Sequence, residues 1–229
     1  MDRITKSKKI FSIILSIALI VTGINIIPSN SSASDKNKKA IAAYDKLLSR
    51  NHYNWSKNDK WNSKVNKPKY YKFSCIDLNG DGVKELVLEN TNASWADCDT
   101  MILKYVNGKI KRVLKCHGIT WYKKSKIISV EDAHTGIFCG NYYKIRNNGK
   151  LINKAEYSGT TDELYRSQAK HKENIGDMTI YYTSYKINGK EKSYKKYCKE
   201  LKRMLKGGKK TKIKLYENSV KNRASHLIK

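Results

Sequence analysis

Three Asn-Gly dipeptides limit how this chain can fold more than any other feature. They stand at Asn107-Gly108, Asn148-Gly149 and Asn188-Gly189, between apolar-rich runs. Asn-Gly suits a type I′ turn, because both central residues of that turn need positive φ angles that these two residue types tolerate best. The repeated Asn-Gly-Lys phrase therefore predicts antiparallel hairpins. Three units are too few to close a propeller, so a single meandering sheet is expected.

The periodicity of the chain changes twice. Residues 69–187 contain short runs that alternate with the period of two typical of strands. These runs are 71–75, 86–88, 102–106, 110–114, 126–130, 137–145 and 179–187. Helical spacing is found over 35–50 and 194–205, and a basic strand-like run over 211–216 leads to a short helix near 219–228. We predict an α+β fold: a meandering antiparallel β-sheet with an N-terminal helix and C-terminal helices.

The first 33 residues have the layout of a secretory signal peptide. Basic residues precede an apolar stretch over 10–27, and a Ser-rich run with a Ser31-x-Ala33 site follows. An uncleaved anchor is the alternative, because this stretch is near the lower limit for spanning a bilayer. We expect an exported, secreted or cell-surface protein with three parts. They are a signal peptide (1–33), an N-terminal helix and linker (34–68), and a β-rich domain with C-terminal helices (69–229).

The chain is strongly basic, with 47 Lys+Arg against 20 Asp+Glu and a net charge of +27. Loss of the predicted signal peptide removes four basic residues and one acidic residue, which leaves +24. The lysines are spread along the chain and form no nucleic-acid-binding motif, so no nucleic-acid partner is expected. A solvated basic surface is the plain explanation. The functional alternative is attraction to the anionic cell wall or membrane surface.

One loop concentrates oxygen ligands. Asp77, Asn79 and Asp81 place hard oxygen atoms at alternate positions, the Val83 carbonyl can add another, and Glu85 can add a carboxylate. Calcium takes six to eight oxygens on a flexible loop. The sequence therefore predicts a structural Ca²⁺ site with these five residues as metal ligands.

A polar turn without metal is the alternative explanation of the same loop, because Asp, Asn and Gly form turns readily. Against it stands the charge pattern. The carboxylates of Asp77, Asp81 and Glu85 repel one another unless a cation neutralises them, and Lys84 alone is a poor substitute.

The loop matches the first six positions of an EF-hand, D-x-[DN]-x-[DN]-G, but Leu88 stands where an EF-hand needs its bidentate Glu. Its flanks also look like strands. It resembles the strand–loop–strand calcium sites of FG-GAP/VCBS-type repeats, whose acidic ligand falls at the ninth position, where Glu85 stands. The wider stretch F-x-x-x-D-L-N-G-D-G-V-K-E-L-V-L, followed by an Asn-Gly-Lys hairpin, also resembles secreted Gram-positive proteins without assigned activity. The resemblance implies structural calcium and no enzyme residues.

Five cysteines in an exported chain invite disulfides. Cys198 falls on the apolar face of its predicted helix, where we expect a free buried thiol. The other four allow three connectivities, among them Cys116 with Cys139 and Cys75 with Cys98. The sequence does not choose between bridges and free thiols.

The leading functional hypothesis is a non-enzymatic binding or interaction module at the bacterial surface. A secreted hydrolase is the alternative, because Glu131, Asp132 and His134 place carboxylates close to an imidazole. A third hypothesis is a cationic effector that acts on anionic envelopes. A cleft that joins His134 to another carboxylate or to Cys139 would favour the hydrolase, and a smooth sheet would favour the module.

Overall fold

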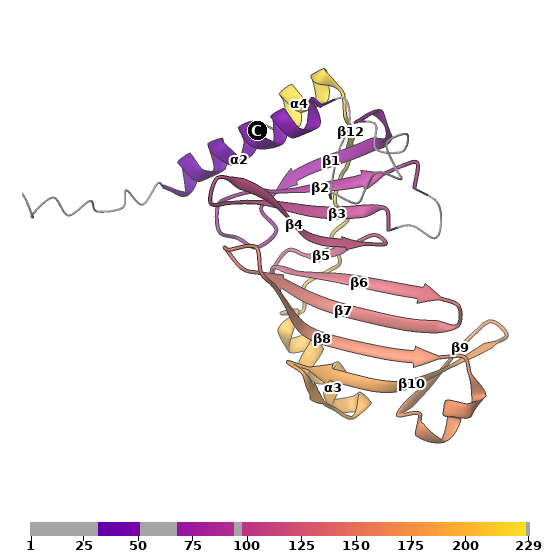
Figure 1. Cartoon of the computed structure of the whole chain (residues 1–229). Coiled ribbons are helices and arrows are strands. Elements are labelled where there is room, and N and C mark those ends of the chain that lie inside the picture. Colours follow the sequence, from indigo (N-terminus) through magenta and orange to yellow (C-terminus); the bar gives the residue numbers. More distant parts are fainter. Residues whose placement is uncertain (1–31, 51–67, 94–97, 228–229) are drawn as a thin grey trace, which may run out of the picture. The chain divides into compact units, whose positions relative to one another are not determined.

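Two antiparallel sheets make up most of the described chain in the computed structural model (Figure 1). The structure describes residues 32–50, 68–93 and 98–227. The predicted signal peptide, apart from its last two residues, and the predicted linker over 51–67 lie outside the described residues. Residues Ala33–Lys229 belong to one compact unit. No helix among the described residues has the length and apolar character needed to cross a membrane.

The first sheet has the strand order β12-β1-β2-β3-β4. Its strands are β1 (Tyr71–Ile76), β2 (Glu85–Asn90), β3 (Thr100–Val106), β4 (Lys109–Cys116) and β12 (Tyr216–Glu217). The second sheet has the order β11-β10-β8-β7-β6-β5, and β9 pairs with β10. Its strands are β5 (Thr120–Tyr122), β6 (Ile127–His134), β7 (Ile137–Ile145), β8 (Leu151–Thr160), β9 (His171–Ile175), β10 (Met178–Ile187) and β11 (Lys190–Glu191).

The α+β fold with antiparallel pairing is confirmed, but the single meandering sheet is wrong. After β4 ends at Cys116, the backbone turns at Gly118, whose φ is 59°, and β5 pairs with β6 instead of β4. The alternation of apolar residues identifies strands, but it does not specify which strands become neighbours. The chain therefore starts a second sheet where the sequence suggested a continuation.

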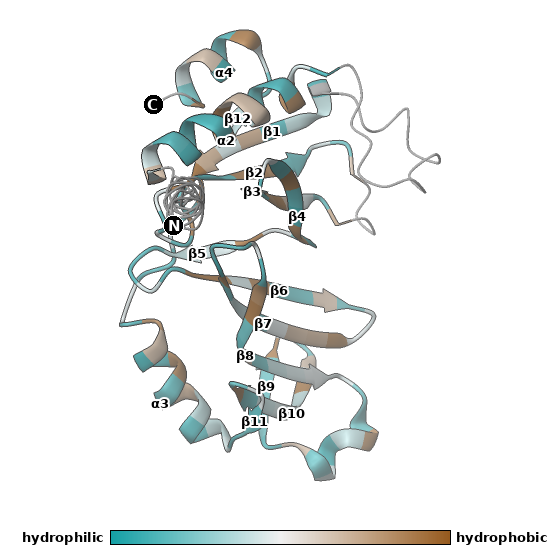
Figure 2. Cartoon of the chain, turned by 60° about the vertical axis from the view of Figure 1, so that its left-hand side comes forward, coloured by the Kyte–Doolittle hydropathy of each residue, from teal (hydrophilic) through white to brown (hydrophobic). Residues whose placement is uncertain are grey.

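Different helices cover the two sheets. They are α2 (Ala33–Leu48), α3 (Tyr194–Met204), α4 (Val220–His226) and the 3₁₀ turns η2 (Pro68–Tyr70) and η3 (Glu163–Gln168). Both α2 and α3 show hydrophilic and hydrophobic segments along their length (Figure 2). The residues of α2 that face the first sheet recur at helical spacing, namely Ala40, Tyr44, Leu47 and Leu48. Each large apolar side chain buried in this way contributes about 1.5–3 kcal/mol.

The central strands β2 and β3 of the first sheet are buried on both faces. Leu86 and Leu88 of β2 pack in one core with α2, whereas Val87 packs in another core with Ile102 and with Trp121 of the second sheet. The alternation of β2 thus directs neighbouring side chains into two different cores. The second sheet has its own aromatic core, which α3 completes through Tyr197.

Two of the three predicted Asn-Gly turns are confirmed. Asn107 and Asn188 have φ angles of 50°, and the glycines after them have 80° and 76°. The type I′ prediction is wrong at Asn148, where only Gly149 has a positive φ. There the N–H of Arg146 donates to the Lys150 carbonyl at 2.9 Å, so a longer turn closes the β7–β8 hairpin.

The predicted strand over 211–216 is also wrong. Only an isolated bridge joins Thr211 to Trp121, and pairing resumes at β12. Ile213 and Leu215 instead pack against the core between the sheets. Their alternation therefore reflects packing of an extended segment and not a hydrogen-bonded ladder.

All five cysteines are free, and the expected burial of Cys198 is wrong because its thiol lies on the exposed side of α3. Tyr197 and Leu201 occupy the side of that helix that faces the sheet. Cys198 follows Tyr197 by one residue, or about 100° of helical rotation, which turns it toward solvent.

Candidate functional site

The predicted calcium loop connects β1 to β2 in the first sheet. The two strands pair up to Ile76 and Glu85, so the loop is the tip of a hairpin, as its strand-like flanks predicted. Gly80 and Gly82 both have φ angles of 81°, a conformation that glycine adopts without steric cost. The tight hairpin tip brings the side chains of the loop toward one another.

The loop satisfies much of its negative charge with its own backbone. The carboxylate of Asp77 accepts hydrogen bonds from the N–H groups of Gly80 at 2.7 Å, Asp81 at 3.2 Å and Gly82 at 3.0 Å. The Asp81 carboxylate accepts from the Val83 N–H at 3.0 Å. Consecutive amides that converge on a carboxylate form an anion-binding nest. Asp77 is therefore stabilised as an anion without a metal.

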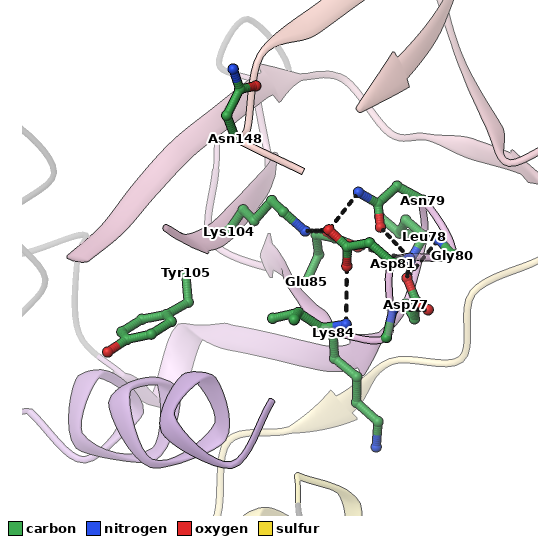
Figure 3. A network of polar contacts seen from close by, with 12 residues as sticks. Asp77, Leu78, Asn79, Gly80, Asp81, Lys84, Glu85, Lys104, Tyr105 and Asn148 are labelled. Carbon is green, nitrogen blue, oxygen red and sulfur yellow. Dashed lines mark hydrogen bonds and ion pairs between the residues drawn. The ribbon is translucent and has the colours of Figure 1, made fainter. Parts of the chain in front are cut away.

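Lys104 of β3 supplies a positive charge to the same cluster. Its Nζ atom lies 2.9 Å from Oδ2 of Asp81 and forms a hydrogen-bonded ion pair with Oε1 of Glu85 (Figure 3). The Lys104 side chain is 1% exposed and that of Glu85 is 0% exposed. The Asn79 amide donates to the same Asp81 oxygen at 3.1 Å. A buried ammonium thus lies among three of the five predicted calcium ligands.

The register of the sheet explains how Lys104 reaches the loop. Leu86 of β2 pairs with Leu103 of β3, and one step further along this antiparallel register Glu85 faces Lys104. The N–H of Leu78 donates to Oε2 of Glu85 at 2.8 Å, so both oxygens of this carboxylate are engaged. The loop, β2 and β3 hold the pair together.

The electrostatics of the pair follow from its burial. Desolvation raises the pKa of Glu85 to about 7, and the attraction of the Lys104 ammonium opposes that rise. Burial by itself lowers the pKa of Lys104, but the carboxylates of Glu85 and Asp81 outweigh it and raise this pKa above its usual value. Within this pair, Lys104 is therefore the more firmly charged member.

Neighbouring elements fix the loop from two sides. Nε1 of Trp121 donates to the Leu78 carbonyl at 3.2 Å, which ties the loop to the second sheet. On the other side, the Lys84 N–H donates to Oδ1 of Asn37 in α2 at 2.9 Å, and Tyr44 donates to the Lys84 carbonyl at 3.1 Å. The loop is a junction between α2 and both sheets.

As arranged, these residues do not fit a calcium ion. Calcium needs six to eight oxygens at about 2.3–2.6 Å, whereas the Lys104 ammonium already contacts Asp81 and Glu85. The described residues contain no group of three or more His, Cys, Asp or Glu side chains that could hold a metal. Calcium binding by Asp77, Asn79, Asp81, Val83 and Glu85 stays a prediction, and it requires Lys104 to leave the cluster.

Lys84 is the lysine closest to the carboxylates in the sequence, and sequence analysis judged it a poor substitute for a cation. In the structure it is Lys104 that neutralises them. In Figure 3 the Lys84 side chain extends away from the carboxylates. The available signal was a lysine inside the apolar strand-like run Met101–Val106. A lysine at a buried strand position needs an acidic partner, since charged side chains are almost never fully buried unpaired.

A second cluster surrounds the predicted hydrolase residues. A hollow of 610 Å³ is lined by four acidic residues and two histidines, which are Glu89, Asp99, Glu131, Asp132, His117 and His134. Within β6, strand alternation puts Asp132 and His134 on one face and Glu131 on the other. The lining of the hollow includes His134 and carboxylates from both sheets. Of the two carboxylates on β6, only that of Asp132 lies on the same face of the strand as His134.

A second hollow is basic. It has a volume of 660 Å³, and its lining includes no acidic residue. Its polar lining residues are Lys144, Arg146, Asn147, Asn148 and Lys154, and its apolar lining residues are Ile145 and Ile152. Sequence analysis did not single out this group, because the lysines of the chain are not clustered in sequence.

The chain matches no protein-family model, no curated protein and no solved structure.

Proposed function

We propose that the protein is an exported, non-catalytic binding module that attaches to the anionic surface of the cell envelope. The observation that carries this proposal is the basic hollow at the β7–β8 hairpin. Three cations line it, from Lys144, Arg146 and Lys154, and no carboxylate neutralises them within it. The net charge of +27 adds a long-range attraction to any anionic surface.

The β7–β8 hairpin fixes the backbone positions from which the cations of the hollow project. The pairing of β7 with β8 is irregular at Tyr142–Tyr143, where Ala155 and Asn153 are the partners and Lys154 is the extra residue. Such a bulge re-aims a side chain. The N–H of Lys150 donates to the Asn148 side chain at 3.0 Å, which orders the turn. A pre-ordered set of donors loses little conformational entropy when it binds an anion.

The lining suits phosphate or carboxylate groups. Arg146 can donate two parallel hydrogen bonds to one anionic group, while Lys144 and Lys154 act as point charges. The amides of Asn147 and Asn148 add donors and acceptors for neighbouring hydroxyl groups. Exposed charges of this kind are screened by salt, so binding should weaken as ionic strength rises.

Co-sedimentation with phosphatidylglycerol-rich vesicles, compared with phosphatidylcholine vesicles, tests the proposal. We expect salt-sensitive binding to the anionic vesicles alone. A variant with Lys144→Gln, Arg146→Gln and Lys154→Gln should bind about tenfold more weakly, since the loss of each surface contact costs a fraction of a kcal/mol. Absence of binding by the wild-type protein to the anionic vesicles would contradict the proposal.

The control variant removes an equal charge elsewhere. Lys109, Lys111 and Arg112 are exposed on β4, and their replacement by Gln also removes two lysines and one arginine. This variant should keep most of the binding. An equal loss in both variants would show that net charge acts without a specific site.

A hydrolase is the second candidate, because one observation favours it. The hollow of 610 Å³ is lined by His134 and Asp132 of β6 and by Asp99, which directly precedes β3. A carboxylate and an imidazole in one cleft can act as a general acid and base. The purified protein would then lower the turbidity of isolated Gram-positive cell walls. Asp132→Asn and His134→Ala should abolish this activity, while Asp177→Asn in the exposed β9–β10 turn should not. Turbidity equal to that of buffer alone rules this candidate out.

A further inference from the structure

We propose that the Lys104 ammonium is the built-in cation of the β1–β2 loop and takes the place of a divalent ion. The loop therefore reaches its folded conformation without calcium. This inference does not depend on the binding function proposed above. The calcium motif and the observed contacts are then consistent, because the ammonium stabilises the loop in the way that a metal ion would.

The Lys104 ammonium already occupies the position that a cation would take. Nζ of Lys104 lies 2.9 Å from Asp81 and is hydrogen-bonded to Glu85, which are two of the predicted ligands. Figure 3 shows the Lys104 side chain entering the cluster from the strand side, opposite the backbone of the loop. A calcium ion placed among these carboxylates would meet the ammonium, and two cations do not share such a site.

Lys104 also has little freedom to leave the cluster. The side chain is 1% exposed. Its aliphatic stem passes close to the β7–β8 turn, where a Cβ atom added to Gly149 would lie 4.0 Å from Cδ of Lys104. The strand that carries Lys104 pairs with β2 on one side and β4 on the other. Displacement of the ammonium by calcium would disturb this packing.

Every carboxylate of the cluster accepts hydrogen bonds from donors within the protein. Three backbone N–H groups serve Asp77. Asp81 has Lys104, the Asn79 amide and the Val83 N–H. Glu85 has Lys104 and the Leu78 N–H. Buried carboxylates that are paired and hydrogen-bonded in this way need no further cation.

The inference predicts that removal of the ammonium creates a need for a cation. Lys104→Met keeps an unbranched stem of similar shape and removes the charge. The variant retains the predicted ligand set Asp77, Asn79, Asp81, Val83 and Glu85 on a loop that now lacks its positive centre. Calcium is then the cation whose preferences match these oxygens.

Thermal unfolding in chelator and in excess calcium tests this prediction. The wild-type melting temperature should be the same in both. Lys104→Met should melt at a lower temperature in chelator, and calcium at about 100 times its Kd should raise that temperature by about 5–10 °C. A folded Lys104→Met protein that does not respond to calcium would overturn the proposal.

Lys84→Met is the matched control, because it removes a lysine from the loop itself whose side chain extends away from the carboxylates in Figure 3. It should behave as the wild type does in both buffers. A calcium response in this variant equal to that of Lys104→Met would show that any lost lysine suffices, and would also overturn the proposal.

A measurement on the wild-type protein decides the matter if Lys104→Met fails to fold. Equilibrium dialysis with radioactive calcium should detect no saturable binding that depends on the loop. Saturable binding to the wild type that Asp81→Asn abolishes would show that calcium displaces Lys104, and the proposal would fail.

Discussion

The two sheets bury polar groups in opposite ways. Beside the first sheet, Lys104, Asp81 and Glu85 form a charged cluster in which each member has a partner. In the second sheet several of the buried polar groups are phenols, and the hydroxyl groups of Tyr197 and Ser129 have no hydrogen-bond partner within the described residues. The first region is organised by charge pairing that requires one geometry. The second is organised by aromatic packing that tolerates an unpaired hydroxyl group.

The aromatic core of the second sheet extends through α3. The ring centroids of Tyr185 and Tyr197 are 4.9 Å apart, and those of Tyr182 and Tyr185 are 6.0 Å apart. Such pairs add about 0.5–1.5 kcal/mol beyond the burial of their area. Gly140 leaves room for this packing, because a Cβ atom there would lie 2.1 Å from the Tyr157 ring. Shape therefore specifies this core more than polar partners do.

The largest expected effect separates a buried ion pair from a surface pair. Lys104→Met should lower the free energy of unfolding by about 3–5 kcal/mol in chelator, because it leaves buried carboxylates without their cation. Lys186→Met in the second sheet should cost far less, because an exposed ion pair is screened by water. Lys186 pairs with Glu156 at 2.8 Å, but both side chains are about one-third exposed. Chemical denaturation of both variants checks the difference, and equal costs would contradict the contrast between the regions.

Alkaline pH should act mainly on the second sheet. Burial is the main cause of the raised pKa values of its tyrosines. It raises the pKa of Tyr182 to about 12. The others with raised pKa values are Tyr142, Tyr157, Tyr185 and Tyr197. A group whose pKa is raised by folding contributes stability below its unfolded pKa, and that stability is lost as pH rises through the folded value. Above about pH 10, each phenol that ionises only on unfolding should lower the stability by about 1.4 kcal/mol per pH unit.

Denaturant unfolding at several pH values between about 9 and 11 measures this slope. Tyr185→Phe should reduce the slope by the contribution of one phenol. Phenolate absorbance should rise together with the loss of folded structure. If the buried tyrosines ionised near pH 10 while the circular dichroism stayed native, burial would not control their titration.

Removal of one tyrosine hydroxyl from each region should change the stability differently. It should destabilise the protein at Tyr44 and should not do so at Tyr197. The Tyr44 hydroxyl, beside the first sheet, accepts from the Tyr105 N–H at 2.9 Å and donates to the Lys84 carbonyl at 3.1 Å. Tyr44→Phe leaves that N–H unpaired and should cost about 1–3 kcal/mol. Tyr197→Phe removes a buried hydroxyl without a described partner and should be neutral or stabilise by about 1 kcal/mol. Thermal unfolding of the two variants measures both signs, and destabilisation by Tyr197→Phe would reveal a partner for that hydroxyl.

Local patterns predicted much of the fold. The run over 137–145 coincides with β7, and the helical spacing over 194–205 corresponds to α3. The strand-like flanks predicted for the loop correspond to β1 and β2. These features depend on residues that are near one another in the sequence.

The partner of the loop was not predictable in this way. Lys104 follows Glu85 by 19 residues, and its contact depends on the register of β2 with β3. The division into two sheets also depends on strand pairing, which period-two alternation does not specify. The turn at Asn148 departs from type I′ because the hairpin closes between Arg146 and Lys150. Long-range pairing thus decided the partner of the loop and the division into two sheets, whereas a local hydrogen bond decided the turn.

Substitution of an exposed cysteine should have the smallest effect on stability. The rate at which each thiol is alkylated reports how well its region excludes solvent. Burial raises the pKa of Cys75 to about 12 and that of Cys116 to about 12, whereas Cys198 is exposed on α3. The thiolate is the reactive form, so a pKa near 12 slows alkylation about 10³-fold relative to an ordinary thiol at pH 8. Brief treatment with iodoacetamide, followed by peptide mass spectrometry, should label Cys198 first. Cys198→Ser should remove the fast phase and leave the melting temperature unchanged. Equally fast labelling of Cys75 in the folded protein would show that the first sheet opens readily, which its paired and buried charge cluster argues against.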